Sequence, residues 1–241
     1  MSRQLKFVIF IDYDNLLDTQ KSAGILDIVR KALIQLPVDA EFTRITCDVR
    51  IYGGWYEGVD ITHLAQMVTV EIQNDFPTVI RLPDGYGKYI QVAINAELAV
   101  ALMIEPGHHL FNTLRRRGRP GNIRVEEPHN VGCVDAECVL PLMKKLIKKR
   151  RCPKQNCGVL ADDLIYRKEQ KIVDTMLSCD LIQASFEQMD KIILISGDDD
   201  FLPPLRTVIL NGKEVIRFHP KQSNQRATFP HGGAQLLELD L

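Results

Sequence analysis

The stretch FVIFIDYDN, residues 7–15, runs five apolar residues directly into Asp12, Asp14 and Asn15. An apolar run of this kind, followed by turn-forming residues, predicts a buried strand at 5–12. Carboxylates at the end of such a strand are costly to bury and would be better solvated in water. In open α/β sheets, however, functional groups gather at the carboxyl ends of strands. The stretch therefore indicates a functional site at the end of the first strand.

The rest of the chain alternates strand and helix patterns. Apolar runs predict further strands at 44–52, 78–82, 190–196 and 213–219. Apolar residues spaced by three and four predict helices within 16–36, 61–75 and 166–187, and we interpret 88–103 as a strand followed by a helix. This alternation predicts an α/β fold, with a parallel sheet covered by helices on both faces.

Length and composition agree with one main core. The chain has 241 residues, of which 45% are hydrophobic, enough for one core with an insertion. No apolar run reaches the ~18 residues of a membrane span, and the start of the chain lacks a secretory signal pattern. We therefore expect a soluble, cytoplasmic protein. In that compartment the six cysteines are poor candidates for disulfides, and the four that fall in two spaced pairs are candidates for metal binding.

A second strand repeats the design of the first. In KIILISGDDDF, residues 191–201, an apolar run meets a Ser-Gly break and then Asp198, Asp199 and Asp200. If this strand neighbours the first, its acids share one cleft with Asp12. Carboxylates packed together either have raised pKa values or hold a cation, and Mg²⁺ or Mn²⁺ prefers such oxygen ligands. The alternative is a helix cap beside a polar turn.

A third group of acids lies on the predicted helix before the second strand. Asp174 falls within an apolar run, and Asp180 follows six residues later. At ~100° per residue, one helix face cannot present both side chains equally. We favour Asp174 as the site residue, with Asp180 as a surface residue or a partner of a ligand.

Three motifs occur in this order along the chain, together with RIYGGW after the second strand: FIDYDN (10–15), KIVDTMLSCDL (171–181) and SGDDDFLPPL (196–205). Together they resemble the NYN domain family of PIN-like nucleases, in its LabA-like branch. The resemblance covers roughly residues 5–103 and 166–220, and it implies a PIN-like (Rossmann-like) α/β fold in which 1–241 form a single domain. It also implies a metal-dependent nuclease that usually acts on RNA.

The same resemblance implies which residues form the site. Carried over position by position, they are Asp12, Asn15, Asp174, Asp198 and Asp200. The four carboxylates would hold Mg²⁺ or Mn²⁺ for phosphodiester hydrolysis, and Asn15 would orient a ligand or a phosphate oxygen. Asp199 is expected to point away, because consecutive residues rarely face one site. The family commonly has Gly where Ile172 stands, which leaves the acid in place.

Residues 104–165 break the alternation and predict a small inserted subdomain. Cys133 and Cys138 form a first Cys pair, Cys152 and Cys157 form a second Cys pair, and 13 residues separate the pairs. Four thiolates in two short-range pairs predict a structural Zn²⁺ site, in which His129 could replace one ligand. The alternative is four reduced thiols flanking an amphipathic helix.

The insertion is also basic. Residues 104–171 contain 15 Lys and Arg against 8 Asp and Glu, a net charge of +7 that suits a polyanion. The residues that we expect to bind nucleic acid are Arg115, Arg116, Arg117, Arg119, Lys144, Lys145, Lys148, Lys149, Arg150 and Arg151. RGRP at 117–120 resembles the core of an AT-hook, or it is a plain solvated loop. Trp55 would stack on an unpaired base or, equally, cap the core.

The sequence therefore predicts a divalent-metal-dependent nuclease, with RNA favoured over DNA as substrate. One alternative is a nucleic-acid-binding module of the same fold without turnover. Another is a haloacid-dehalogenase-like phosphatase, with Asp12 as nucleophile and Asp14 as general acid and base. Against the phosphatase, the chain lacks the usual threonine two places beyond the second acid.

Overall fold

The computed structural model describes residues 4–36, 44–83, 89–117, 123–135, 137–222 and 236–241. The chain divides into two compact units, which we describe separately. Unit 1 comprises Met1–Thr113 and Lys171–Leu241, and unit 2 comprises Leu114–Gln170. Unit 1 carries all the candidate acids, and unit 2 carries both Cys pairs.

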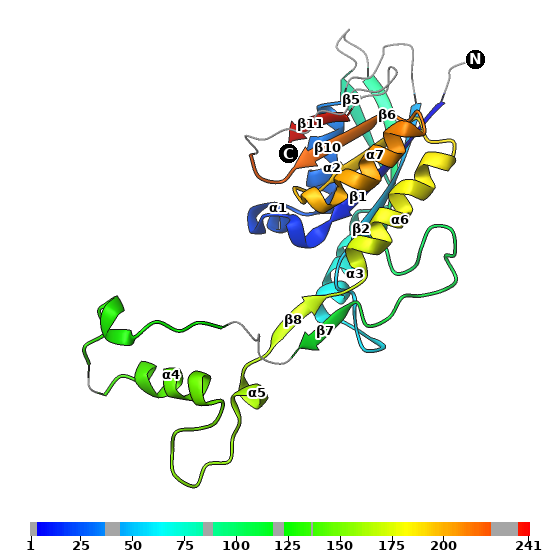
Figure 1. Cartoon of the computed structure of the whole chain (residues 1–241). Coiled ribbons are helices and arrows are strands. Elements are labelled where there is room, and N and C mark those ends of the chain that lie inside the picture. The colour runs from blue at the N-terminus through cyan, green and yellow to red at the C-terminus, as the bar shows by residue number, and fades with distance from the viewer. Residues whose placement is uncertain (1–3, 37–43, 84–88, 118–122, 136, 223–235) are drawn as a thin grey trace. The chain divides into compact units, whose positions relative to one another are not determined.

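Unit 1 is built on a seven-stranded sheet with the order β11-β10-β9-β1-β2-β6-β5 (Figure 1). The strands are β1 (Gln4–Asp12), β2 (Arg44–Tyr52), β5 (Thr78–Pro83), β6 (Tyr89–Leu98), β9 (Lys191–Ile195), β10 (Val215–His219) and β11 (Leu236–Asp240). All neighbouring pairs are parallel except β5 and β6, which are antiparallel. The predicted α/β fold with a mostly parallel sheet is confirmed.

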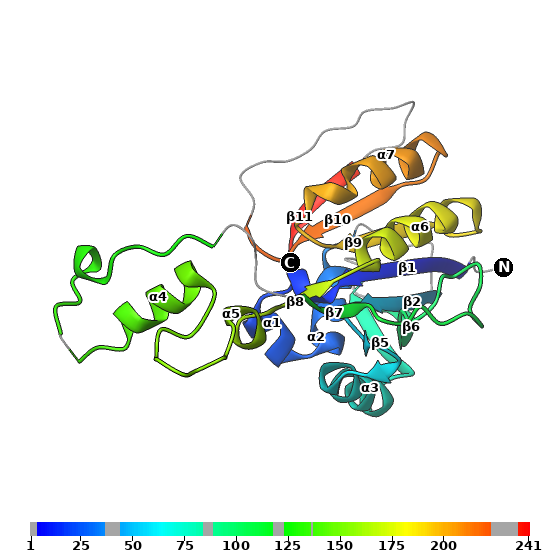
Figure 2. The same ribbon diagram turned by 60° about the horizontal axis from the view of Figure 1, so that its bottom comes forward.

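Helices cover both faces of this sheet. They are α1 (Asp18–Ala23), α2 (Ile25–Ile34), α3 (His63–Asp75), α6 (Val173–Phe186) and α7 (Leu202–Leu210), with short 3-10 helices η1 (Tyr13–Asn15) and η3 (Asp199–Phe201). Figure 2 shows α6 and α7 on one face and α2 and α3 on the other. A strand buried on both faces needs apolar side chains at almost every position, which explains the unbroken run in β1.

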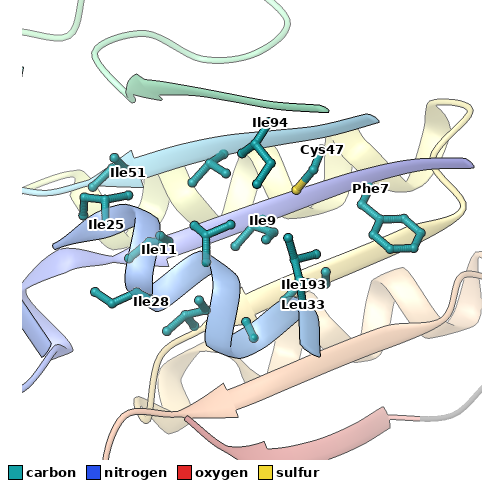
Figure 3. Packing of buried hydrophobic residues seen from close by; sticks show 14 of the residues in the cluster. Phe7, Ile9, Ile11, Ile25, Ile28, Leu33, Cys47, Ile51, Ile94 and Ile193 are labelled. Atoms are coloured by element: carbon teal, nitrogen blue, oxygen red, sulfur yellow. The ribbon is translucent and has the colours of Figure 1, made fainter. Parts of the chain in front are cut away.

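The alternation of side chains along β1 divides the core into two layers. Phe7, Ile9 and Ile11 pack with residues of α2, as Figure 3 shows. Val8 and Phe10 pack on the opposite face, with residues of α6 and α7. Burial of each such side chain stabilises the fold by roughly 1.5–3 kcal/mol, so both layers anchor the strand that ends in Asp12.

The helical pattern predicted within 16–36 is interrupted at Gly24. This residue separates α1 from α2 and has φ +93°, a left-handed conformation that glycine adopts without strain. A Cβ atom there would lie 3.1 Å from Glu71 Oε1. The chain therefore turns at Gly24, and α2 alone presents a buried face to the sheet.

The prediction of a helix at the end of 88–103 is wrong. The strand β6 continues to Leu98, and the residues that follow form a loop with an isolated bridge between Ala101 and His109. The backbone of this loop is bonded to distant groups, since Ala99 N–H donates to Ile51 O at 2.8 Å and Met103 N–H donates to the Asp180 carboxylate at 2.8 Å. These tertiary hydrogen bonds replace the bonds that a helix would need.

The helix predicted within 166–187 begins later than its pattern suggests. Residues Arg167–Gln170 form β8, which pairs antiparallel with β7 (Leu114–Arg117) in unit 2. Ile172 follows with φ +63°, and α6 starts at Val173. Pairing of β8 with a partner distant in sequence thus overrides the local helical pattern.

Short elements complete the two units. Unit 1 also contains a hairpin of β3 (Tyr56–Glu57) and β4 (Asp60–Ile61), and unit 2 also contains η2 (Pro128–Val131), α4 (Leu140–Lys149) and α5 (Ala161–Leu164). Within the described part of the chain, none of the helices has the length and apolar character needed to cross a membrane.

Candidate functional site

Asp12 ends β1 as a nearly buried carboxylate, 6% exposed. Its Oδ2 accepts a hydrogen bond of 2.9 Å from the Ser196 hydroxyl, and the backbone N–H of Asn15 also donates to it. Burial raises the pKa of Asp12 from 3.8 to about 6, and nearby Asp174 and Asp14 add to the increase, which the Ser196 hydrogen bond only partly offsets. A carboxylate at this position is therefore expensive to ionise without a neighbouring cation.

The turn after β9 is tied to the turn after β1. Because Ile11 pairs with Ile195, the two parallel strands reach the same edge of the sheet together. Asn15 Oδ1 accepts a hydrogen bond of 2.8 Å from Gly197 N–H, which holds the two turns side by side. Asn15 is thus a bridge between the two acidic segments.

Asp198 begins the 3-10 helix η3. Its Oδ1 accepts a hydrogen bond of 3.0 Å from Asp200 N–H, and its own N–H donates to Ser196 Oγ at 3.1 Å. Ser196 therefore contacts both Asp12 and Asp198. The helix-cap alternative thus describes part of what Asp198 does.

Asp174 lies in the first turn of α6, at the surface. Partial burial raises its pKa, and the charges of Asp198, Asp200 and Asp14 raise it further. These acids come from three separate segments of the chain, the turn after β1, the turn after β9 and α6. Because charges from the other two segments act on Asp174, the fold gathers these acids at one edge of the sheet.

The arrangement of the acids fits a hard divalent cation that is bound by one or two carboxylates. Among the residues that the structure describes, no three His, Cys, Asp or Glu side chains are placed to hold one metal ion. Mg²⁺ usually takes only one or two carboxylates and completes its shell with water and substrate phosphate. The buried carboxylate of Asp12, with the acids that surround it, is compatible with that mode of binding.

Asp199 pairs with a buried arginine. Arg217 is 1% exposed, and its guanidinium lies 3.1 Å from Asp199 Oδ1 and 3.2 Å from Glu238 Oε1. Its Nε also donates to Ser196 O at 3.0 Å, and His219 contacts the same Glu238 oxygen at 3.1 Å. Sequence reasoning missed this network, because Arg217 and Glu238 lie on strands β10 and β11 with no motif to mark them.

Asp180 is buried in the interior and forms hydrogen bonds there, so it is not the surface residue that the sequence allowed. It is 1% exposed and accepts hydrogen bonds from Tyr52 Oη at 2.7 Å, Met103 N at 2.8 Å and Arg50 Nη2 at 3.3 Å. Burial raises the pKa of Tyr52, which keeps its hydroxyl protonated and able to donate. This carboxylate anchors the loop after β6 to α6 and β2.

Trp55 is part of the core and is not available to stack on a base. It is 0% exposed, and its Nε1 donates to Ile51 O at 3.0 Å. Its ring covers Gly53, where a Cβ atom would lie 2.6 Å from the indole. The alternative of an aromatic residue that caps the core is the one found, and Gly53 is required for that close approach.

The predicted four-thiolate zinc site is not supported. Within each Cys pair the two thiols are hydrogen-bond partners. The first Cys pair ends just before α4 and the second begins just after it, and a ten-residue helix is about 15 Å long. In the described part of the chain, no three of these thiols, with or without His129, are placed to hold one metal ion.

The predicted phosphate-binding residues of unit 2 differ in their availability. Lys144 is 6% exposed and pairs with Glu127, so burial removes it from the surface. Five more of these residues interact with other side chains or groups of the protein. Arg116 stacks on Tyr166, Arg117 pairs with Glu169, and Arg150 pairs with Asp162. Lys148 lies near Glu127, and Arg115 also has an interaction partner. Lys145, Lys149 and Arg151 are exposed. Arg119, with most of RGRP, lies outside the described residues.

A mostly parallel sheet flanked by helices, with acids at its carboxyl edge, is consistent with the PIN-like class of α/β folds. The model of the NYN domain family matches residues 140–229, less than half of the chain. That match includes Asp174, Asp198 and Asp200, whereas Asp12 lies before it. Comparison with curated proteins and with solved structures found no match.

Proposed function

We propose that the protein is a divalent-metal-dependent nuclease of the NYN type, which hydrolyses phosphodiester bonds in nucleic acid and prefers RNA to DNA. The observation that carries the proposal is the gathering of acids from three segments, where burial and, to a smaller extent, the neighbouring charges raise the pKa of Asp174 and of Asp12. The NYN match over 140–229 supports it. The preference for RNA rests on the resemblance of the motifs to that family.

The residues that would hold one or two Mg²⁺ or Mn²⁺ ions, with one or two carboxylates to each ion, are Asp12, Asp174, Asp198 and Asp200. A cation bound there would supply Lewis-acid stabilisation of charge on the scissile phosphate and would lower the pKa of an attacking water. The chemistry of the donor set agrees with this role, because hard cations prefer carboxylate oxygens.

The other residues of the site position these acids. The Ser196 hydroxyl donates to the Asp12 carboxylate and accepts from the backbone N–H of Asp198, so one side chain ties Asp12 to the turn that carries Asp198. Asn15 ties the two turns through Gly197, and Arg217 binds the Asp199 carboxylate. The carboxylates are thus held in place before substrate binds, which lowers the cost of reorganisation during the reaction.

The exposed cations of unit 2 would grip the phosphate backbone. Lys145, Lys149 and Arg151 carry charge at the surface, and such contacts neutralise phosphates without reading sequence. We expect affinity for nucleic acid to fall with increasing salt. Substitution of two of these residues should reduce the slope of log K against log salt by about 1.4–1.8.

The test is cleavage of labelled single-stranded RNA and DNA with Mn²⁺, with Mg²⁺ and with EDTA. Wild type is compared with Asp198→Asn, and Asp60→Asn serves as the control, because Asp60 is an exposed acid on the β3–β4 hairpin. We expect metal-dependent cleavage that falls at least about 100-fold in Asp198→Asn and persists in Asp60→Asn.

Other outcomes would favour the alternatives. Salt-sensitive binding of either polymer without cleavage would indicate a binding module of the same fold. Hydrolysis of a small phosphomonoester without cleavage of either polymer would indicate a phosphatase. Equal cleavage by wild type and Asp198→Asn would contradict the assignment of the site.

A further inference from the structure

A cluster of partly exposed aromatic rings lies in unit 1, formed by Tyr56, His109 and Phe111. The ring centroids of Tyr56 and Phe111 are 4.9 Å apart at an interplanar angle of 74°, and those of His109 and Phe111 are 6.0 Å apart. Phe111 is 45% exposed despite being a large apolar side chain. We call these three residues the aromatic cluster.

Backbone hydrogen bonds hold the aromatic cluster in place. Asn112 N–H donates to Gly58 O at 2.7 Å, and Tyr56 N–H donates to Thr113 Oγ1 at 2.9 Å, so the loop that carries Phe111 is fastened to the β3–β4 hairpin. The Tyr56 hydroxyl also lies 3.4 Å from His109 Nδ1. The rings are therefore presented by a tethered surface and not by a loose loop.

The aromatic cluster adjoins the acidic edge of the sheet. A pocket lined by residues 107–111 also includes Ile172, the residue that precedes α6. Asp174 is two residues further on, in the first turn of that helix. Tyr56 follows β2 by four residues, and β2 ends beside Asp12 on the neighbouring strand. The rings and the acids thus belong to the same edge of unit 1.

We propose that the aromatic cluster binds an unpaired base of the nucleic-acid substrate next to the acidic site. This inference rests on the proposed nuclease function and adds that the substrate is single-stranded at the point of cleavage. Every base has a π-face that stacks on an aromatic ring, whereas a paired and stacked base does not expose that face. The edge-to-face packing of Tyr56 and Phe111 leaves ring surface for such a contact.

The cluster differs from a nearby aromatic residue that the sequence singles out. Trp55 is larger and lies in the same glycine-flanked stretch, but it is buried in the core. Tyr56 is only partly buried, and it packs against both the core and the ring of Phe111. A base bound at Phe111 would bring its own phosphate toward the acids, because the pocket beside Phe111 reaches Ile172 at the start of α6.

The experiment measures binding of a short single-stranded oligoribonucleotide by fluorescence anisotropy, in an Asp198→Asn background that prevents cleavage. In that background we compare Phe111→Ala with Phe186→Ala, since Phe186 is another exposed phenylalanine, at the far end of α6. Phe111→Leu keeps apolar packing while removing the ring. A second oligonucleotide carries abasic sites and the same phosphates.

We expect Phe111→Ala to weaken binding of the normal oligonucleotide by about 5- to 150-fold. Phe111→Leu should weaken it similarly, and Phe186→Ala should leave it unchanged. Neither Phe111 variant should alter binding of the abasic oligonucleotide. A double-stranded RNA of the same length should also be insensitive to Phe111.

Two results would overturn the inference. One is equal affinity of Phe111→Ala and Phe186→Ala for the normal oligonucleotide, and the other is an equal loss on the normal and abasic oligonucleotides. Cleavage assays on the same substitutions in wild-type background separate this failure from failure of the proposed function. Metal-dependent cleavage that is indifferent to Phe111 would remove the base site and keep the nuclease, whereas absence of both binding and cleavage in wild type would remove the nuclease.

Discussion

Replacement of Asp12 by asparagine is expected to stabilise the protein while abolishing its activity. In the folded state burial raises the pKa of Asp12 from 3.8 to about 6, and the other acids add to the increase. Because the folded carboxyl binds its proton more tightly than the unfolded one, stability falls as pH rises from about 4 to about 6. Above that range the loss is complete.

The magnitude follows from the size of the pKa difference. One pKa unit corresponds to 1.36 kcal/mol, so a difference of about two units corresponds to roughly 3 kcal/mol of lost stability at pH 7. The asparagine side chain of the Asp12→Asn variant carries no charge, and its amide oxygen can still accept the hydrogen bond from the Ser196 hydroxyl. The variant should therefore be more stable than wild type by up to about 3 kcal/mol at pH 7.

The assay is urea unfolding in the presence of EDTA, monitored by circular dichroism at pH 4 and at pH 7. Asp12→Asn should match wild type at pH 4 and exceed it at pH 7, whereas the exposed control Asp60→Asn should show no such difference. Added Mn²⁺ should raise the melting temperature of wild type but not that of Asp12→Asn, because cation binding stabilises the state that binds it. Lower stability of Asp12→Asn at pH 7, or an equal gain at both pH values, would refute this reasoning.

Three further predictions concern residues outside the acidic edge. Arg217→Met leaves the buried Glu238 carboxylate without its guanidinium partner, so urea unfolding should report a loss of about 3–5 kcal/mol. Adding Glu238→Gln to that variant should recover part of the loss, and no recovery would contradict the pairing. Asp180→Leu leaves the Tyr52 hydroxyl and the Met103 N–H without their acceptor, at a cost of about 2–6 kcal/mol in the same assay. Asp180→Asn keeps an acceptor and should cost less. Mild oxidation should close a disulfide within each Cys pair, and peptide mapping that finds bonds between the pairs would contradict their separation by α4.

The acidic site illustrates how two levels of structure combine. Each acidic segment follows a strand or begins a helix, which local patterns indicate. Whether the segments meet depends on the strand order, in which β1 lies directly beside β9. The hydrogen bond from Gly197 to Asn15 then fixes their relative position. The contribution of Asp174 to the raised pKa of Asp12 therefore depends on the tertiary structure.

The sequence by itself determined the α/β class, the five predicted strands and the acids that end two of them. These features depend on the spacing of apolar residues along the chain and on where each apolar run ends. They can therefore be predicted from residues that are close in sequence. The break at Gly24 was also present as a glycine within a helical pattern, although its positive φ needed the structure.

Only the tertiary structure decided which side chains are available. The sequence predicts a surface cation at Lys144, and it leaves open whether Trp55 stacks on a base or caps the core and whether Asp180 lies at the surface or supports a ligand. All three are buried. The aromatic cluster joins Tyr56 to residues more than fifty positions later. Burial and neighbourhood arise from contacts between distant segments, which no local pattern records.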